Sequence, residues 1–430
     1  MRALLCSINY APELTGIGKY TAEMAEWLAE RGIEVTVITT PPYYPAWSVA
    51  RGYSARRYQA ETIAGVNVIR CPVWVPRRAS AAKRLLHLAS FAITSMPVLL
   101  WSAIRLRPEL VFVIEPPLFA APAACVAAKL AGATAWLHVQ DFEVDAAFNL
   151  GMLRSRTLRK IALALEARVM RSFHCVSTIS ERMLRLLAKK KVSAAQTRLF
   201  PNWVDLERIR PLPHPTLLRV RHFKDDETVV LYSGNMGAKQ GLETLIETAN
   251  LLAASGDDKI RFVFCGDGVG RADLERLAGA AKNIVFWPLV PAEHLNELLN
   301  TADVHVLTQR ADVADSVFPS KLTNMLASGR SVVATANAGT QIADVLDGCG
   351  RVVTPGNPVA LAAAIRELAA DSELRQTLGA AARAVAERLW DKNTVLADVF
   401  GAHVAADAAS YATLADEPLE QQRAVRARRA

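Results

Sequence analysis

The sequence predicts an α/β protein made of two Rossmann-like, doubly wound domains. Short apolar segments alternate with amphipathic helical segments in both halves of the 430-residue chain. Strand–helix alternation at this spacing is typical of a parallel sheet with helices on both faces. The rhythm breaks at a proline-rich stretch, residues 211–215, and then starts again. A chain of this length is also long for a single hydrophobic core, which favours two domains.

The first domain is assigned to residues 1–205. The apolar run at residues 3–8 is too short for the core of a signal peptide and leads into a glycine-rich turn, so we interpret it as the first strand. Residues 20–31 have the periodicity of a helix. Strands covered on both faces are expected to be uniformly apolar. By this criterion the strands lie at residues 4–8, 35–39, 111–114, 135–139 and 175–177.

The second domain is assigned to residues 229–385, after a linker at residues 206–228. A last helix is expected at residues 386–404, around Trp390. The basic tail at residues 405–430 is expected to be weakly ordered. Strands of the second domain are expected at residues 229–233, 260–265, 284–287, 304–308 and 332–335.

Composition narrows the classes of function. The six cysteines are scattered without a C-x-x-C pair, which argues against a disulfide framework and a zinc site and favours a reducing, cytoplasmic compartment. The net charge of +8 is compatible with nucleic acid, anionic lipid or phosphorylated substrates. The sequence contains no recognisable nucleic-acid module, so we expect no nucleic-acid partner.

One segment departs from the α/β rhythm. Residues 85–104 are almost wholly uncharged and follow a basic cluster, and their length would suffice to span a bilayer. His87, Pro97 and a position between strands of one sheet argue against a span. Two interpretations remain: a buried domain helix, or a helix pair at the headgroup boundary with its cations facing anionic lipid. We favour the second, with residues 73–104 as the membrane contact, because the substrate inferred below is lipid-borne.

A glycine-rich turn follows the predicted first strand of the first domain. It contains Gly16, Ile17, Gly18 and Lys19. Glycines at a strand-to-helix turn let backbone N–H groups approach an anion, although a simple tight turn would need them equally. Thr21 stands where a dinucleotide fingerprint needs its third glycine, so an NAD enzyme is disfavoured.

Two glycine turns of the second domain could bind a phosphorylated ligand. Gly234, Asn235 and Lys239 follow its first strand, a combination that can hold a diphosphate through backbone donors and one cation. The next strand ends in another turn, at the edge where ligands of open α/β sheets gather. That turn contains Gly266, Asp267 and Gly268.

A helix expected after residue 318 adds further polar groups. Pro319 and Ser320 lead into it, and Ser320 is a candidate N-cap. Lys321 could neutralise phosphate, and Asn324, three residues on and on the same face, could hydrogen-bond ribose hydroxyls. Leu322, the residue after Lys321, is also assigned to the ligand-binding residues of this segment. The alternative is a capped surface helix with a solvated lysine.

Together these motifs resemble the retaining glycosyltransferases of family four, which have the GT-B fold. The resemblance covers nearly the whole chain, from Met1 to about Gly401. The bacterial colanic-acid and exopolysaccharide members look closest, and one of them is described as a fucosyltransferase. The resemblance rests on the glycine turns above and on His138 to Glu143, Pro201-Asn202-Trp203-Val204-Asp205, Gly234 to Gly241, Pro319 to Gly329 and Trp390-Asp391.

This resemblance implies two domains facing across a cleft, with the last helix crossing back to the first domain. It implies transfer of a sugar from a nucleoside diphosphate sugar to a lipid-linked saccharide, with retention and without a metal or other cofactor. The first domain would bind the acceptor, and its Gly16 turn would contact acceptor or phosphate. Lys239, Lys321 and the turn amides of the second domain would stabilise negative charge on the leaving phosphate. The enzyme would then work peripherally at the inner face of the plasma membrane.

Two residues of the first domain are candidates for catalysis. Asp141 ends a strand and could orient the acceptor hydroxyl. His138 lies three residues earlier and is either a functional residue or an ordinary core histidine.

The chain also departs from the family. Members often carry Arg and Lys in the first turn of the second domain, where this sequence has Asn235 and Gln240. The family's paired glutamates, eight residues apart, fall on Ser316 and Asn324. Asp312 or Asp315 could replace the first glutamate.

Two other functions stay open. A nucleotide-sugar 2-epimerase shares the fold and would need a carboxylate and a histidine in its cleft. A two-domain sugar-binding protein would need no catalytic group. The sugar, the nucleotide, the acceptor, the linkage and the oligomeric state do not follow from the fold, because a few contacts of the site decide them.

Overall fold

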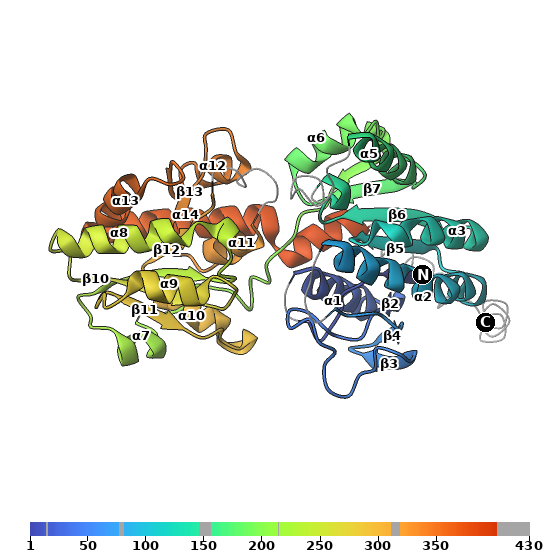
Figure 1. The fold of residues 1–430 in the computed structure, drawn as a ribbon, viewed down its shortest axis with the longest axis horizontal. Coiled ribbons are helices and arrows are strands. Elements are labelled where there is room, and N and C mark those ends of the chain that lie inside the picture. Colours follow the sequence, from blue (N-terminus) through green and yellow to red (C-terminus); the bar gives the residue numbers. More distant parts are fainter. Residues whose placement is uncertain (14–15, 77–80, 146–155, 214, 311–318, 402–430) are drawn as a thin grey trace, which may run out of the picture. The chain divides into compact units, whose positions relative to one another are not determined.

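The computed structural model describes residues 1–13, 16–76, 81–145, 156–213, 215–310 and 319–401. The chain divides into two compact units (Figure 1). Unit 1 comprises residues 1–201 together with the chain from residue 396, and unit 2 comprises residues 202–395. Each unit is described by itself below.

Unit 1 is built on an eight-stranded sheet with the order β3-β4-β2-β1-β5-β6-β7-β8. All neighbouring strands are parallel except β3 and β4. The central strand β1 pairs with β2 on one side and β5 on the other. The strands are β1 (Arg2–Cys6), β2 (Glu34–Thr39), β3 (Gln59–Ile63), β4 (Val66–Arg70), β5 (Leu110–Glu115), β6 (Thr134–Val139), β7 (Cys175–Thr178) and β8 (Thr197–Leu199).

Helices cover both faces of this sheet. The largest cluster of buried side chains joins one face of β5 and β6 to residues of α2, α3 and α6. On the other face Phe400, from the helical residues 392–401, packs against Phe112, Trp136 and Phe200, with ring centroids 5.6–5.9 Å apart. The helices are α1 (Gly16–Glu30), α2 (Ala81–Leu106), α3 (Ala121–Ala131), α5 (Arg156–Met170) and α6 (Glu181–Lys189), with 3₁₀ turns η1 (Leu118–Ala120) and η2 (Ala194–Gln196).

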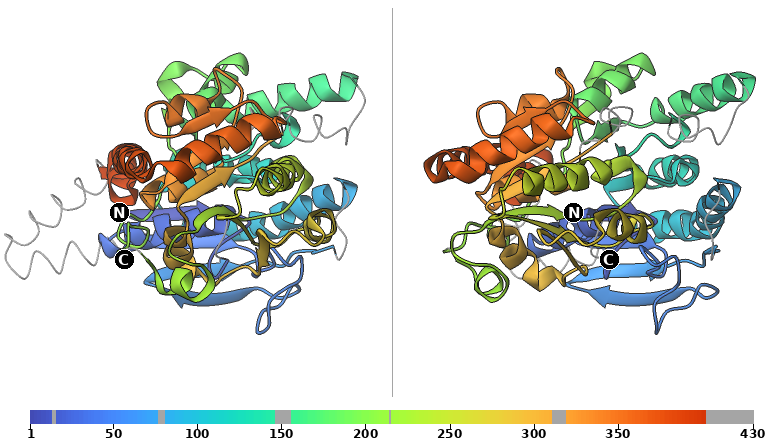
Figure 2. Two further views of the ribbon diagram at one scale, coloured as in Figure 1. Left: turned by 90° about the vertical axis from the view of Figure 1, so that its left-hand side faces the viewer. Right: turned by 60° about the vertical axis from the view of Figure 1, so that its left-hand side comes forward.

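Unit 2 has a six-stranded, fully parallel sheet with the order β11-β10-β9-β12-β13-β14. The strands are β9 (Thr228–Ser233), β10 (Ile260–Cys265), β11 (Ile284–Trp287), β12 (Val304–Leu307), β13 (Ser331–Thr335) and β14 (Arg351–Val353). One face packs against α8 (Leu242–Ala254), α9 (Arg271–Ala278) and α13 (Pro358–Ala370). Helices on the other face are α7 (Leu217–His222), α10 (Leu295–Thr301), α11 (Ser320–Ala327), α12 (Gln341–Leu346) and α14 (Ser372–Trp390), and Figure 2 gives two further views.

The predicted fold class is confirmed: both units are α/β with a parallel sheet and helices on both faces. Every strand expected from an apolar run is present. Four strands were not expected. β3, β4, β8 and β14 are short or alternate polar with apolar residues, so they lack the uniform apolar signal of strands covered on both faces.

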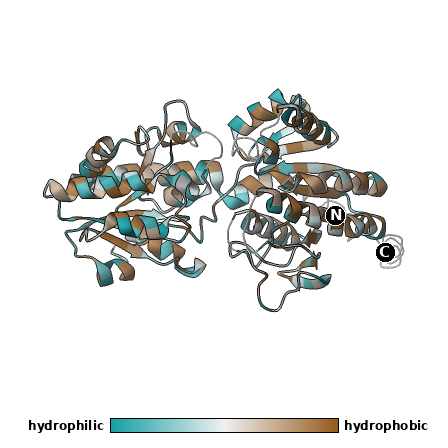
Figure 3. Ribbon diagram, in the orientation of Figure 1, coloured by the Kyte–Doolittle hydropathy of each residue, from teal (hydrophilic) through white to brown (hydrophobic). Residues whose placement is uncertain are grey.

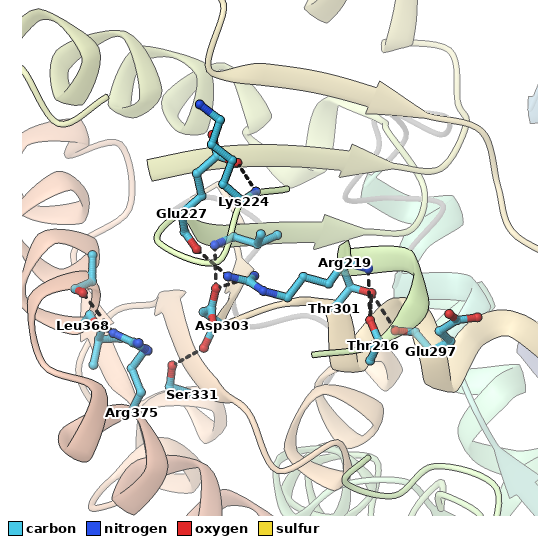
Figure 4. Close-up of polar contacts among 12 residues, drawn as sticks. Thr216, Arg219, Lys224, Glu227, Glu297, Thr301, Asp303, Ser331, Leu368 and Arg375 are labelled. Atoms are coloured by element: carbon cyan, nitrogen blue, oxygen red, sulfur yellow. Dashed lines mark hydrogen bonds and ion pairs between the residues drawn. The ribbon is translucent and has the colours of Figure 1, made fainter. Parts of the chain in front are cut away.

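The described residues of the segment expected to be a linker, 206–213 and 215–228, belong to unit 2. Within it, the Arg219 guanidinium is buried and donates to Asp303 Oδ2 at 2.9 Å (Figure 4). Asp303 Oδ2 also accepts from the Val229 N–H at 2.7 Å. Thr216 caps α7 and meets Thr301 of α10, with 2.9 Å between the hydroxyl oxygens. The prolines that mark the break in the sequence therefore do not separate this segment from the second unit.

The last helical stretch also differs from the expectation of one helix at residues 386–404. Helix α14 ends at Trp390, within unit 2, and a separate helical segment covers residues 392–401. The chain passes from unit 2 to unit 1 at residues 395–396. Val204, near the point where the chain enters unit 2, forms an isolated parallel bridge with Asp391, near the point where the chain leaves it.

Helix α2 is a single continuous helix of 26 residues with Pro97 inside it, so the expected helix pair is wrong. It is long and apolar enough to cross a membrane, a test that the core helix of a soluble protein also passes. One side, with Phe91, Leu99 and Ala103, is fully buried. The opposite side exposes large apolar side chains, among them Ile93 at 68% and Ile104 at 64% exposure, so α2 is a half-buried domain helix rather than a buried one. Figure 3 shows the hydropathy of the residues along the ribbon.

We predict that Asp303→Ala lowers the free energy of unfolding of unit 2 by about 3 kcal/mol, because it leaves the buried Arg219 guanidinium without its carboxylate. Asp226 pairs with Lys259 in an exposed ion pair, so Asp226→Ala is a matched control and should leave stability almost unchanged. Denaturant titration followed by circular dichroism measures both. Equal shifts for the two variants would contradict the role given to Arg219.

Candidate functional site

The topology of unit 2 marks one edge of its sheet as a binding site. Strand β9 lies between β10 and β12, so the connections leaving β9 and β12 turn to opposite sides. In open α/β sheets, ligands bind outside the carboxyl ends of the strands at such a switch point. The segments that follow β9, β10 and β12 in unit 2 therefore come to the same edge.

Two glycine turns at this edge pack backbone against backbone. The Gly234 N–H donates to the Cys265 carbonyl at 2.9 Å, and the Met236 N–H donates to the Asp267 carbonyl at 2.8 Å. Gly266 has φ +146°, and a Cβ added there would lie 2.0 Å from the Gly234 carbonyl oxygen. A Cβ on Gly268 would lie 2.6 Å from the Met236 carbonyl oxygen. Only glycine fits both positions, so the two predicted turns form one rigid unit.

Lys321 lies against the first of these turns. Its Nζ donates to Tyr232 Oη at 2.9 Å and stands 4.2 Å from the centre of the Tyr232 ring. A Cβ on Gly234 would be 3.4 Å from Lys321 Nζ. Tyr232 Oη in turn donates to the Asn235 carbonyl at 2.6 Å. The Lys321 side chain is half-buried, and the loss of hydration lowers its pKa to about 8.

The start of α11 differs in detail from the prediction. Pro319, rather than Ser320, is the N-cap, and no side chain caps the helix. Leu322 is fully buried in the core between α11 and α14, so its side chain packs the helix and cannot contact a ligand. Asn324 is half-buried one turn after Lys321. Asp312, Asp315 and Ser316 lie outside the described residues.

Lys239 and Arg310 occupy the side of this edge toward β12. Lys239 lies in η3 (Ala238–Gln240) with an exposed side chain, and its carbonyl accepts from the Arg310 N–H at 3.1 Å. A Cβ on Gly241 would be 3.2 Å from Arg310 Cγ. The sequence analysis did not single out Arg310. Its position shortly after the end of β12, at the ligand-binding edge of the sheet, was the signal that could have identified it. Asn235 and Gln240 stand at the positions where the family resemblance leads one to expect Arg and Lys. Gln240 Oε1 accepts a hydrogen bond from the Gly237 N–H at 3.2 Å.

The Gly16 turn of unit 1 is organised around a carboxylate. Gly16 begins α1 with φ +60°, and a Cβ on Gly18 would lie 3.0 Å from Glu13 Cβ. Glu13 is buried and accepts from the Tyr43 and Tyr44 N–H groups, both at 2.8 Å. Gly18 therefore leaves room for a carboxyl group of its own chain, which explains this glycine without a bound phosphate. Ile17 is half-buried in this turn, and Lys19 pairs with Glu23 along the helix, with 3.8 Å between the charged atoms.

His138 lies in the core of unit 1, which is the position of an ordinary core histidine. It is 4% exposed, its Nδ1 is 2.9 Å from Ser177 Oγ, and Gln140 Nε2 donates to its Nε2 at 2.9 Å. Its ring lies 4.8 Å from that of Phe200. Burial lowers its pKa to about 3, so the imidazole is neutral at physiological pH and we assign it no proton transfer.

A half-buried glutamate, Glu143, lies two residues after the exposed Asp141 and was missed by the sequence analysis. Glu143 Oε2 accepts from the Leu118 N–H at 2.7 Å, and burial raises the pKa of Glu143 to about 7. Glu115, at the end of β5, is fully buried beside it. Both follow strands of the unit 1 sheet at its carboxyl edge, where Asp141 also lies.

The cysteines and acidic residues give no sign of a metal centre. All six cysteines are free thiols, and five of them are buried. Among the described residues, no three His, Cys, Asp or Glu side chains are placed to hold a metal ion.

Comparison with known proteins identifies the class. The family model for the glycosyl transferase 4-like domain matches residues 15–203, and that for glycosyl transferases group 1 matches residues 215–385. The chain belongs to the group 1 glycosyltransferases and is a glycosyltransferase. WcaI of Escherichia coli (strain K12), named for a glycosyl transferase of colanic acid biosynthesis, is 42% identical over 407 residues, which are 92% of this chain and 98% of that protein.

Solved structures agree on the architecture. Sucrose-phosphate synthase from Thermosynechococcus elongatus matches with a TM-score of 0.73 at 19% identity, over 95% of this chain and 99% of that one. HepE from Anabaena, solved with UDP and glucose, matches with a TM-score of 0.66 at 15% identity, over 94% and 99%. At these identities the likeness shows the fold, which is GT-B as the sequence predicted.

We predict that Gly266→Ala destabilises unit 2, because the new methyl group collides with the Gly234 carbonyl. Gly256→Ala is the matched control: Gly256 also has positive φ, at +84°, but nothing lies within 4 Å of an added Cβ. It should cost only the backbone strain of about 1 kcal/mol. Thermal melts separate the two, and an equal loss of stability in both variants would refute this description of the turn.

Proposed function

We propose that the protein transfers a glycosyl group from a nucleoside diphosphate sugar to a lipid-linked saccharide, with retention of configuration and without a metal or other cofactor. The observation that carries this proposal is the position of Lys321, half-buried against Gly234 at the switch point of unit 2. A cation held beside glycine turns is suited to a diphosphate.

The donor assignment has support from the relatives. HepE was solved with UDP and with UDP-glucose, and it shares the fold of this chain. In the present chain the donor would meet Gly234, Asn235, Gly266 and Gly268, with Asp267 at the same edge. Pro319, Ser320 and Asn324 would then lie beside its nucleoside part, and Lys321 beside its phosphates.

The proposed reaction depends on charge at the leaving group. As the bond between the sugar C1 and the β-phosphate oxygen breaks, negative charge collects on that phosphate. An ammonium group already held in place by Tyr232 stabilises this charge without reorganising. The acceptor hydroxyl forms the new bond to C1 and loses its proton. With retention it attacks from the side of the departing phosphate, whose oxygen is then the nearest proton acceptor.

The biological setting proposed is synthesis of a surface or exopolysaccharide of the colanic acid type. It rests on the 42% identity to WcaI over almost the full length of both chains. A fucosyl group is the first donor sugar to test. Asp141 stays a candidate for orienting the acceptor hydroxyl, and Lys239 a candidate for a second contact to the diphosphate.

A panel of nucleoside diphosphate sugars with a membrane extract as acceptor source tests the proposal. We expect release of nucleoside diphosphate with one sugar only, and only when extract is present. Formation of an epimer without extract would establish the 2-epimerase alternative instead. Sugar binding without any nucleotide release would point to a sugar-binding protein.

We predict that UDP affinity falls as pH rises through about 8, because Lys321 loses the proton that attracts the diphosphate. Lys321→Met should weaken UDP binding about 100-fold at pH 7 and remove this pH dependence. The folded state holds this proton less tightly than the unfolded state, so stability rises with pH from about 8 until the unfolded lysine has also titrated. Lys321→Met should therefore melt at a higher temperature than the parent at pH 7.

The exposed Lys282→Met is the control for this prediction and should change neither property. Titrations with UDP and melts between pH 6 and pH 10 provide the measurements. A Lys321→Met variant with unchanged UDP affinity would remove the main support for the donor site.

We further propose that the protein attaches peripherally to the inner face of the plasma membrane through α2 and α3. These helices contact each other and contain no Asp or Glu. Their cations, Lys83, Arg84, Arg105 and Lys129, suit anionic lipid. An apolar face flanked by cations is typical of an interfacial helix. The exposed apolar side chains are Leu86, Ile93, Met96, Trp101 and Ile104 of α2, with Phe119, Val126 and Leu130 around α3.

We predict that Ile93→Glu reduces binding to vesicles of phosphatidylglycerol and phosphatidylethanolamine at least about tenfold, because a carboxylate would enter the interface. Val359→Glu alters a similarly exposed side chain of unit 2, 67% against 68%, and should have no effect. Vesicle sedimentation measures both. Equal binding by the two variants would refute this face as the contact.

A further inference from the structure

A groove in unit 1 has no assigned role. It has a volume of about 630 Å³ and lies where β2 and β4 end, between residues 47–56, residues 72–75 and helix α2. Its lining includes Trp47, Arg56, Trp74, Ser90 and Thr94. We propose that this groove binds sugar rings of the lipid-linked acceptor, an inference that rests on the proposed function.

The walls of the groove are held rigidly by α2. His87 Nδ1 lies 2.7 Å from the Trp74 carbonyl oxygen, and the Trp74 N–H donates to Ser90 Oγ at 3.0 Å. Thr94 Oγ1 donates to the Pro72 carbonyl at 2.6 Å. Three successive turns of the helix thus fix the segment that carries Trp74. A fixed wall binds a ligand at lower entropic cost than a mobile one.

Trp47 is held in a strained conformation at the groove. Its φ is +51°, which costs a bulky residue about 1–2 kcal/mol. The indole packs edge-on against Tyr43, with ring centroids 5.7 Å apart, and lies 5.5 Å from the His87 ring. Backbone strain that places an aromatic side chain in a groove is typical of a binding site rather than of a loop that only connects strands.

The lining has the chemistry of a saccharide site. A sugar ring has one face of C–H groups and an edge of hydroxyls. Trp74, 45% exposed, offers a flat apolar surface for the face, and Arg56 and Ser48 offer polar groups for the edge. An acyl or isoprenoid chain would not use these polar groups. Mostly apolar walls with a few fixed polar groups are typical of small-molecule sites.

The same helix connects this groove to the proposed membrane contact. Ser90 and Thr94 line the groove, whereas Leu86 and Ile93, on a neighbouring side of α2, belong to its exposed apolar face. A saccharide whose lipid is in the bilayer would therefore be within reach of the groove when α2 lies at the interface. This geometry favours a lipid-linked saccharide over a free soluble one.

Trp74→Ala tests the proposal against Leu277→Ala, a control in unit 2 with a similarly exposed apolar side chain, 48% against 45%, that does not line the groove. With the sugar donor found in the panel and detergent-solubilised extract, we expect Trp74→Ala to raise the KM for acceptor about tenfold and leave the KM for donor unchanged. Leu277→Ala should leave both unchanged. Trp74→Phe should restore part of the acceptor affinity, since a smaller flat ring remains.

Three outcomes would overturn the groove assignment while leaving the proposed function intact. One is an unchanged acceptor KM for Trp74→Ala in an enzyme that turns over. Another is a raised donor KM together with the acceptor KM. The third is weaker vesicle binding by Trp74→Ala with unchanged affinity for the water-soluble saccharide that mild acid releases from the extract, which would identify a lipid contact. If the parent enzyme binds that saccharide but shows no turnover, the proposed function is refuted and the assignment of the groove stands.

Discussion

The contact on which the proposed donor site depends is the approach of Gly234 to Gly266. Because a side chain at Gly266 would overlap the Gly234 carbonyl, the two turns can meet only as bare backbone. Lys321 Nζ lies beside the first of these turns, 3.4 Å from the position that a Cβ on Gly234 would take. The parallel register of β9 and β10, with Cys265 opposite Ser233, brings the turns to the same level. Sheet register, glycine and lysine therefore form one continuous arrangement rather than three separate motifs.

This arrangement places a cation where the fold alone would not favour one. Lys321 contacts a tyrosine hydroxyl and a ring, which stabilise an ammonium group less than a carboxylate would. Arg219 in the same unit shows the contrast, since Asp303 and a backbone carbonyl satisfy its buried guanidinium. The buried Arg219 is thus neutralised by its own chain, whereas no such carboxylate contacts Lys321 Nζ among the contacts described above, as the proposed diphosphate site requires. Proteins commonly give up stability at functional sites in this way.

Sequence reasoning was most reliable where one physical cause dominates. Uniform apolar runs predicted the central strands, and glycine spacing predicted the turns after β9 and β10. It failed where tertiary contacts decide. Residues 206–228 resemble a linker because of their prolines, yet Arg219 finds Asp303 84 positions away. His138 and Glu143 belong to one motif, and only packing distinguishes the core imidazole from the half-buried carboxyl group. The groove at Trp47 joins three distant segments, so no local pattern could reveal it.

Helix α2 shows why an apolar segment of this length need not cross a membrane. Its buried side completes the core of unit 1, and its Ser90 and Thr94 hydrogen-bond to the segment after β4. Withdrawing the helix into a bilayer would break these contacts and expose the core beneath. The exposed apolar side, by contrast, gains by meeting lipid without any change in fold. The same helix thus packs on the sheet and lines the groove, and the membrane contact proposed for it would use a different side.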